Sequence, residues 1–186
     1  MINPIPHFVK QKKLDQGNEL SESVVQMQEC SHPCLDYCLQ QSHNGQSYLI
    51  TPILPATLFI IMQNKIHLDD TTKQIIAVGI AFGLKYLHQK DYVHYNLTLD
   101  AIKLDENNHP YISDFGQTFK ENVDRKWCAP EQQTDEELGT DAMKRANIFS
   151  FGLILLWLTC GYSFPSGKPI PRSTKEELVA DAESKY

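Results

Sequence analysis

The sequence lacks an apolar run long enough to cross a bilayer. Its longest apolar stretch, residues 148–160, falls short of the roughly 20 residues that a transmembrane helix needs. Residues 1–13 also lack the apolar core of a secretion signal. We therefore expect a soluble, cytoplasmic protein with no membrane partner.

Basic residues are scarce relative to acidic ones. Lysine and arginine number 17 against 23 aspartates and glutamates, which gives a formal net charge of −6. A nucleic acid is attracted by surplus positive charge, because its phosphate backbone is polyanionic. The sequence therefore predicts no nucleic-acid partner.

Cysteines are few and odd in number, at five. Without a secretion signal they are expected to be reduced thiols rather than a disulfide framework. Cys30, Cys34 and Cys38 recur around His32, a pattern that raises the alternative of a zinc site. Pro33 interrupts any helix that would put these side chains on one face, and no second ligand pair lies at a finger-like distance. We therefore expect no metal here.

Internal repeats and low-complexity segments are also absent. Of 186 residues, 41% are apolar and 22% charged, which is an ordinary globular composition. This length suffices for one compact core and excludes a large multidomain protein. We expect a single domain over residues 1–186.

Hydrophobic spacing predicts three helices. Residues 19–30 have apolar positions at helical intervals, and the Ser31-His-Pro33 sequence ends them. Capping side chains at residues 69–72 precede a second helix, whose apolar face runs to Leu87. Residues 146–160 are apolar nearly all round, which predicts a helix buried in the centre of a helical layer.

Extended segments are predicted between these helices. Residues 35–39 and 47–54 flank turn-forming residues 43–45 and are typical of a hairpin. Shorter buried strands are expected at residues 92–94, 101–104 and 111–113.

Four motifs then occur in a familiar order. They are Y-V-H-Y-N-L-T-L-D-A-I-K-L-D (92–105), D-F-G (114–116), K-W-C-A-P-E (126–131) and N-I-F-S-F-G (147–152). Together they resemble the protein-kinase catalytic domain, and K-W-C-A-P-E is most similar to its tyrosine-kinase-like branch. The resemblance covers about residues 8–165.

This resemblance implies an α+β, protein-kinase-like fold. The small β lobe would be truncated, spanning about residues 1–52. The large lobe, about residues 53–186, would be mostly helical and shortened at its C-terminal end. Because the family's later helices do not follow, we expect apolar surface on the helix at 146–160 to be uncovered.

The same resemblance assigns residues to a nucleotide site. Lys10, in H-F-V-K, matches the lysine that holds the phosphates, although it also fits a surface lysine. Thr51 matches the gatekeeper, and Leu54 would offer its backbone N–H to adenine. Asp114 would bind magnesium or, alternatively, cap local backbone. No glycine precedes Lys10, so the phosphate-covering loop is missing.

The catalytic loop departs from the family pattern. Asn96 stands where an aspartate would orient the substrate hydroxyl and accept its proton, which a neutral amide cannot do. Thr98 replaces a lysine that neutralises the transferred phosphoryl group. Ala101 replaces an asparagine that holds the second magnesium.

The adenine and regulatory positions are altered as well. Phe8 and Lys103 fall where the family has small or apolar residues above and below adenine, so ATP binding should be weak or absent. Ser23 occupies the regulatory-helix glutamate position, beside Glu22. Thr118 is the only hydroxyl-bearing residue of the activation segment.

Residues that stabilise the fold match the family pattern better than the catalytic residues do. Met27, His94 and Phe115 match an apolar stack that joins the lobes. Asn147 replaces an aspartate that anchors the catalytic loop, and its amide can still accept backbone hydrogen bonds.

These features lead to a pseudokinase hypothesis, with ATP and magnesium bound weakly at most. The domain would act as a scaffold or allosteric regulator in signalling, binding a true kinase or a substrate. An atypical, weakly active kinase is the alternative, and a truncated remnant without independent function is a third.

Overall fold

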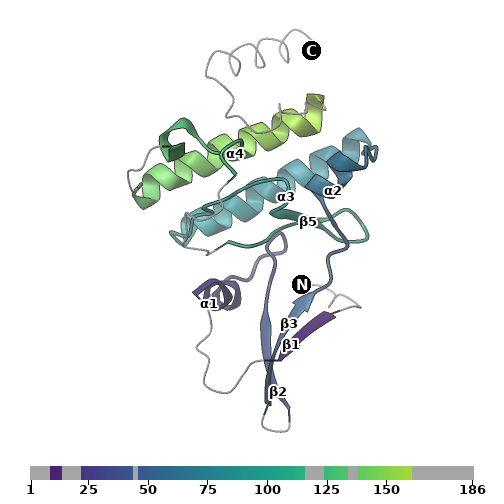
Figure 1. The fold of residues 1–186 in the computed structure, drawn as a ribbon, viewed down its shortest axis with the longest axis vertical. Coiled ribbons are helices and arrows are strands. Elements are labelled where there is room, and N and C mark those ends of the chain that lie inside the picture. Colours follow the sequence, from purple (N-terminus) through teal and green to yellow (C-terminus); the bar gives the residue numbers. More distant parts are fainter. Residues whose placement is uncertain (1–8, 14–21, 44–45, 116–123, 134–137, 161–186) are drawn as a thin grey trace.

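The computed structural model describes residues 9–13, 22–43, 46–115, 124–133 and 138–160. Phe8 and Thr118 lie outside these ranges. The elements form an α+β fold in which a small sheet and one helix stand apart from a larger helical part (Figure 1). This arrangement confirms the predicted fold class.

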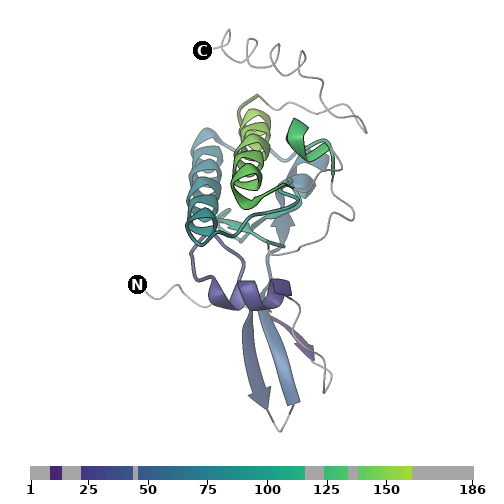
Figure 2. The same ribbon diagram turned by 90° about the vertical axis from the view of Figure 1, so that its left-hand side faces the viewer.

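The small sheet is antiparallel and three-stranded, in the order β1-β3-β2. Its hairpin projects away from the helices (Figure 2). The pairing of His43 with Gln46 confirms the predicted hairpin. Its first strand begins at Leu39 rather than at Leu35, and Leu35 makes only an isolated bridge to Ile112. The strands are β1 (Val9–Lys13), β2 (Leu39–His43) and β3 (Gln46–Pro52).

Helix α1 (Glu22–Glu29) is the described part of the helix expected at residues 19–30. Its C-terminal end is tied to the helical part, because Tyr92 Oη donates to Glu29 Oε2 at 2.5 Å. Lys90 Nζ also donates to the Glu29 carbonyl oxygen at 3.4 Å. Met27 packs against the core cluster that contains Phe115.

The second sheet consists of β4 (Ala56–Thr57), β5 (Ile102–Leu104) and β6 (Pro110–Ile112), in that order. Residues 92–94, expected as a strand, form a loop instead, since the His94 backbone N–H and C=O bond to Asn147 rather than to a ladder. Helix α2 (Leu58–Gln63) was not predicted, because six residues give too short a pattern to separate helix from strand.

Helix α3 (Asp70–Gln89) begins where its capping residues predict. Asp69 is its N-cap and accepts from the Thr72 backbone N–H at 2.9 Å. The buried side of α3 packs on β6 and carries two glycines, which permit this close approach. A Cβ at Gly83 would lie 2.8 Å from Ile112 Cδ1.

Gly79→Ala is expected to lower the free energy of unfolding by about 1–3 kcal/mol, as overpacked cores do. The new Cβ would lie 2.4 Å from Cγ of Pro110, whose ring moves little. Urea titration measures the loss. Gly152→Ala in α4 is the control, because no atom lies within 4 Å of its Cβ position. There the better helix propensity should stabilise by up to about 1 kcal/mol, and equal losses at both sites would contradict the packing account.

Helix α4 (Thr140–Cys160) begins earlier than the apolar run, and it is not buried all round. Trp157 and Ile154 face the core, whereas Ile148 is 55% exposed. Ile148 is thus the one large apolar side chain of α4 that is exposed among the described residues. Among the described residues, no helix has both the length and the apolarity that a bilayer crossing requires.

Candidate functional site

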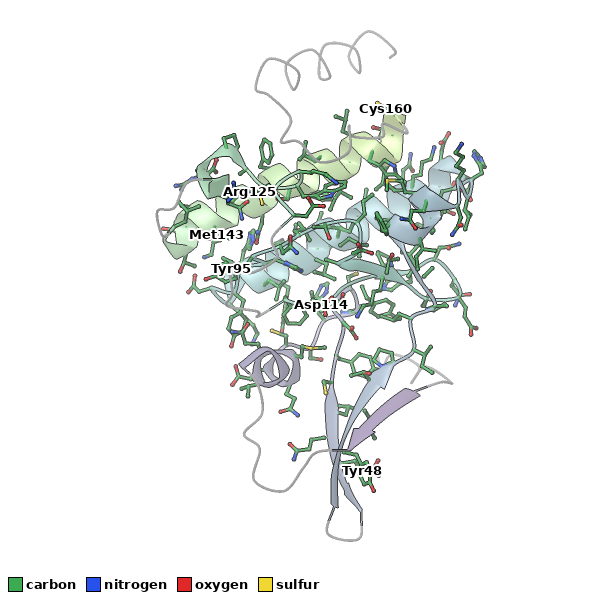
Figure 3. The ribbon with its side chains drawn as sticks, in the orientation of Figure 1. Tyr48, Tyr95, Asp114, Arg125, Met143 and Cys160 are labelled. Atoms are coloured by element: carbon green, nitrogen blue, oxygen red, sulfur yellow. The ribbon has the colours of Figure 1, made fainter. Side chains whose placement is uncertain are left out.

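Asp114, one of the residues expected to form the nucleotide site, lies where the two parts of the molecule meet. Figure 3 shows Asp114 at this boundary, between the helices and the base of the hairpin. The segment that leads into β2 is hydrogen-bonded to β6: Asp36 N–H donates to the Ile112 carbonyl oxygen, and Ile112 N–H donates to that of Cys34, both at 2.9 Å. These bonds fix the segment that leads into β2 relative to β6.

Asn147 of α4 anchors the loop at His94, which leads to the positions that the sequence predicts as catalytic. Its Oδ1 accepts from the His94 backbone N–H at 2.8 Å, and its Nδ2 donates to the His94 carbonyl oxygen at 2.5 Å. His88 Nε2 lies 3.2 Å from the same Oδ1. Because Asn147 and His94 are both buried, these bonds satisfy backbone groups that water cannot reach.

His94 connects this loop to the end of β6. Its Nδ1 accepts from the Asn96 backbone N–H at 3.2 Å, so its Nε2 is the protonated nitrogen and donates to the Ser113 carbonyl oxygen at 2.8 Å. Burial lowers the pKa of the imidazole, which keeps it neutral near pH 7. His94 therefore has a structural role here.

Asn96 is engaged in a structural hydrogen bond. Its Oδ1 accepts from the Asp124 backbone N–H at 3.1 Å and so ties the loop to the segment that follows residues 116–123. An amide in this position has no lone pair basic enough to take a proton from an alcohol.

Thr98 and Ala101 are both buried, at 7% and 5% exposure. Thr98 Oγ1 accepts from the Ala101 backbone N–H at 3.4 Å, and the Ala101 carbonyl oxygen accepts from the Ser113 backbone N–H at 2.9 Å. These side chains hold the turn of the loop together and add neither a positive charge nor a metal ligand.

Asp114 is exposed and has a backbone φ of 58°, a conformation that Asp adopts more readily than most residues. Its Oδ2 accepts from Ser113 Oγ at 3.0 Å. Burial raises the pKa of the Asp100 carboxyl, and the negative charges of Asp124 and Asp114 raise it further. The described residues nevertheless contain no group of three or more side chains placed to hold a metal ion.

Lys103 of β5, expected below the adenine, makes an ion pair with Asp36. Its Nζ lies 3.1 Å from Oδ2 of Asp36, which is only 5% exposed. The other oxygen of Asp36 accepts from the Tyr37 backbone N–H at 2.9 Å. Burial raises the pKa of the Asp36 carboxyl, and the Lys103 ammonium opposes this rise.

Asp36 was missed by the sequence reasoning. The signal was present, because Lys103 interrupts an apolar strand, and a charged side chain within such a strand needs a partner. Asp36 likewise interrupts the apolar run at residues 35–39. Only the folded chain shows that these two irregularities, 67 residues apart, meet.

The nucleotide positions are described in part. Lys10 pairs with Thr51 across β1 and β3, as neighbours in one sheet, but the Lys10 side chain lies outside the described part. Leu54 is half-buried in the link between β3 and β4. Ser23 and Glu22 are in the first turn of α1, and their side chains also lie outside the described part.

The K-W-C-A-P-E segment is anchored on α4. Ser150 Oγ donates to the Trp127 carbonyl oxygen at 2.6 Å, and the 3₁₀ helix η1 (Pro130–Gln133) follows. Cys128 is buried, and burial raises the pKa of its thiol to about 11, so it is an inert thiol rather than a nucleophile.

Comparison with known proteins places these observations in a family. The family model for protein tyrosine and serine/threonine kinases matches residues 7–186. The chain is 32% identical to human dual specificity testis-specific protein kinase 2 over 158 residues, covering 76% of this chain and 27% of that protein. It is 26% identical to mouse cAMP-dependent protein kinase catalytic subunit PRKX over 167 residues, covering 87% and 46%.

A solved structure supports the fold. The crystal structure of the yeast RNA Pol II CTD kinase CTDK-1 complex matches with a TM-score of 0.69 at 17% identity, covering 92% of this chain and 60% of that chain. The chain spans less than half the length of the two curated relatives above.

Proposed function

The chain belongs to the protein tyrosine and serine/threonine kinase family, and from this premise we propose that it is a pseudokinase. It acts in the cytoplasm by binding another protein, either a kinase or a kinase substrate, as a scaffold or allosteric regulator. Residues 1–186 form one kinase-like domain, with the small lobe at about residues 1–52.

The observation that carries this proposal is the state of Asn96. The family's catalytic aspartate is replaced by an amide, and the amide oxygen is occupied by the Asp124 backbone N–H. General-base catalysis contributes about 10²–10⁴-fold to a rate, or roughly 3–5 kcal/mol of barrier. Thr98 and Ala101 remove two further contributions, the neutralising charge and the second metal ligand.

The residues present do not fit a tightly held ATP–magnesium complex. Adenine sites are largely apolar, whereas the floor position here holds an ammonium paired with Asp36. Asp114 is the one carboxylate retained at the family's magnesium positions, and magnesium needs several oxygen ligands. Any nucleotide bound through Asp114, Lys10, Thr51 and Leu54 would be held weakly.

A thermal-shift titration with ATP and magnesium tests this proposal. A ligand present at 100 times its Kd stabilises a fold by about 2.7 kcal/mol, a shift of several degrees in a chain of this length. We expect no shift at millimolar ATP, and no transfer of radiolabelled phosphate to the chain itself or to a generic substrate.

Two variants make the result decisive. Transfer that is lost in Asp114→Ala but kept in Glu106→Ala, an exposed turn residue, would overturn the proposal in favour of the weakly active kinase. A full-length sample without a cooperative melting transition would favour the truncated remnant instead.

A further inference from the structure

The segment between α1 and β2 connects α1 and the small sheet to the helical part of the molecule (Figure 1). This α1–β2 link comprises residues 30–38. Its Cys34 carbonyl oxygen accepts from the Ile112 backbone N–H at 2.9 Å. A Cβ at Gly83 of α3 would lie only 3.1 Å from the same oxygen. The link is therefore packed against both α3 and β6, and its conformation determines how α1 is held against them.

His32 closes the first turn of the α1–β2 link. Its Nδ1 accepts from the Cys34 backbone N–H at 3.1 Å. Its ring contacts the Tyr86 ring of α3, with the two centroids 5.1 Å apart, and Tyr86 Oη accepts from the Ser31 backbone N–H at 3.2 Å. A protonated Nδ1 has no lone pair to offer. The turn as it stands therefore requires a neutral imidazole at His32.

His109, in the turn that precedes β6, holds the same peptide group from its other end. Its Nε2 lies 3.0 Å from the Pro33 carbonyl oxygen, which can only accept, so this nitrogen is the donor. The same Nε2 lies 3.7 Å from Cys34 Sγ. The Pro33–Cys34 peptide group thus has one imidazole at its C=O and another at its N–H. A proton on His109 keeps its donor, whereas a proton on His32 removes the acceptor.

The surroundings of His32 favour its neutral form. Burial lowers the pKa of His32, and the charge of His109 lowers it further. Burial also raises the pKa of the Cys34 thiol, which therefore offers no negative charge. The Asp105 carboxylate accepts from the His109 backbone N–H at 2.9 Å, which places it beside His109. The titratable and charged groups around the two rings are Cys30 and Cys34 in the link, Tyr86 and Lys90 of α3 and its C-cap, Tyr111 of β6, Asp105 of the β5–β6 turn and Glu29 at the end of α1.

We propose that the α1–β2 link is a pH-sensitive hinge, which opens when His32 takes up a proton and releases the Cys34 N–H. Opening leaves this N–H of a buried residue without its partner and places a positive charge beside His109. The hold of the link on α3 and β6 then weakens, and α1 loosens with it. This inference is independent of the pseudokinase assignment, because it uses none of the catalytic positions.

The pH range of the hinge follows from the direction of the shift. A histidine whose folded pKa lies below its unfolded value of about 6.5 stabilises the closed form fully above that value. This contribution is lost as the pH falls below about 6.5, because the open form then binds more protons. At pH 5.0, about 1.5 pH units lower, the open form is favoured by up to about 30-fold relative to neutral pH.

Amide hydrogen exchange of the full chain, followed by NMR and corrected for the intrinsic pH dependence of exchange, tests the hinge. We expect the protection factor of the Cys34 amide to fall at least tenfold between pH 7.5 and pH 5.0. The Cys30 amide, which donates to the Gln26 carbonyl oxygen at the end of α1, should lose protection as well. Unchanged protection at Cys34, or a loss confined to Cys34, would overturn the hinge.

Two variants assign the effect to His32. His32→Asn keeps an acceptor oxygen near the position of Nδ1 but does not titrate, so the fall at Cys34 should shrink to less than twofold. His67→Asn, at an exposed histidine, should behave as the wild type. An equal fall in His32→Asn would mean that Cys34 exchanges through unfolding driven by other histidines, such as His88 and His94, and would overturn the proposal.

His109→Gln tests the second imidazole without removing His32. The Gln side-chain amide can still donate to the Pro33 carbonyl oxygen, but it carries no charge. Because the charge of His109 helps to lower the pKa of His32, we expect this variant to raise that pKa. The loss of Cys34 protection should begin at a correspondingly higher pH. NMR titration of the His32 ring measures the pKa, and an unchanged value would contradict the coupling of the two rings.

Discussion

Lys103→Met is expected to lower the free energy of unfolding by about 3 kcal/mol, the cost of leaving one member of a buried ion pair without its partner. Asp36 cannot reach water to recover this loss, because its side chain is only 7% exposed. In a chain of this length the change corresponds to a fall in melting temperature of about 6–12 °C. Urea unfolding followed by the fluorescence of the buried Trp127 and Trp157 measures it.

The Lys73–Asp70 pair provides a matched control. Its N–O distance is also 3.1 Å, but the Asp70 side chain is 92% exposed. Lys73→Met should therefore cost no more than about 0.5 kcal/mol. If Lys73→Met lost as much stability as Lys103→Met, the burial of Asp36 would not be the cause of the larger loss.

The double variant Asp36→Val/Lys103→Leu separates charge from packing. Replacing both members of a buried pair by apolar residues is often neutral, so we expect stability within about 1 kcal/mol of the wild type. If the double variant lost as much stability as the Asp36→Val and Lys103→Leu single variants lose together, the two side chains would not be coupled.

The pH dependence of the Lys103→Met loss has a definite sign. Burial raises the pKa of Asp36, and removing the opposing ammonium should raise it further. A carboxyl whose folded pKa exceeds its unfolded value of about 3.9 loses stability as pH rises through that window. The loss should be smaller at pH 5 than at pH 8.

Asn147→Ala is expected to cost about 2–4 kcal/mol, since it leaves two buried backbone groups of His94 without partners. Both partners are buried, so water cannot readily replace the lost amide. Urea unfolding followed by tryptophan fluorescence measures this loss of stability.

Two other variants distinguish hydrogen bonding from general disruption. Asn147→Asp keeps the acceptor for the His94 N–H but loses the donor to its carbonyl oxygen, so the loss should be about 1–2 kcal/mol. Asn64→Ala removes an exposed amide that donates to the Ile60 carbonyl oxygen at 3.0 Å, and should cost about 0.5 kcal/mol or less. An Asn64→Ala loss matching Asn147→Ala would contradict the role of burial.

Local patterns predicted the long elements of this fold well. Asp69 and the apolar face that follows it located α3, and the turn residues at 43–45 located the hairpin. The loop at residues 92–94 was mistaken for a strand because its apolar residues are buried by tertiary contacts, while its polar backbone is satisfied by a side chain of α4. Propensity carries no information about such a partner.

The sequence by itself determined the kinase family, because the family depends on which residue types stand in ordered motifs, and the proposed loss of the catalytic base rests on one of those motifs. Only the tertiary structure decided that Lys103 has Asp36 as its partner and that Asn96 is held by Asp124. It also brought α3 and α4 together around an apolar groove. The reason is physical: ion pairs and cavities depend on distances between residues remote in the chain, and local spacing does not encode those distances.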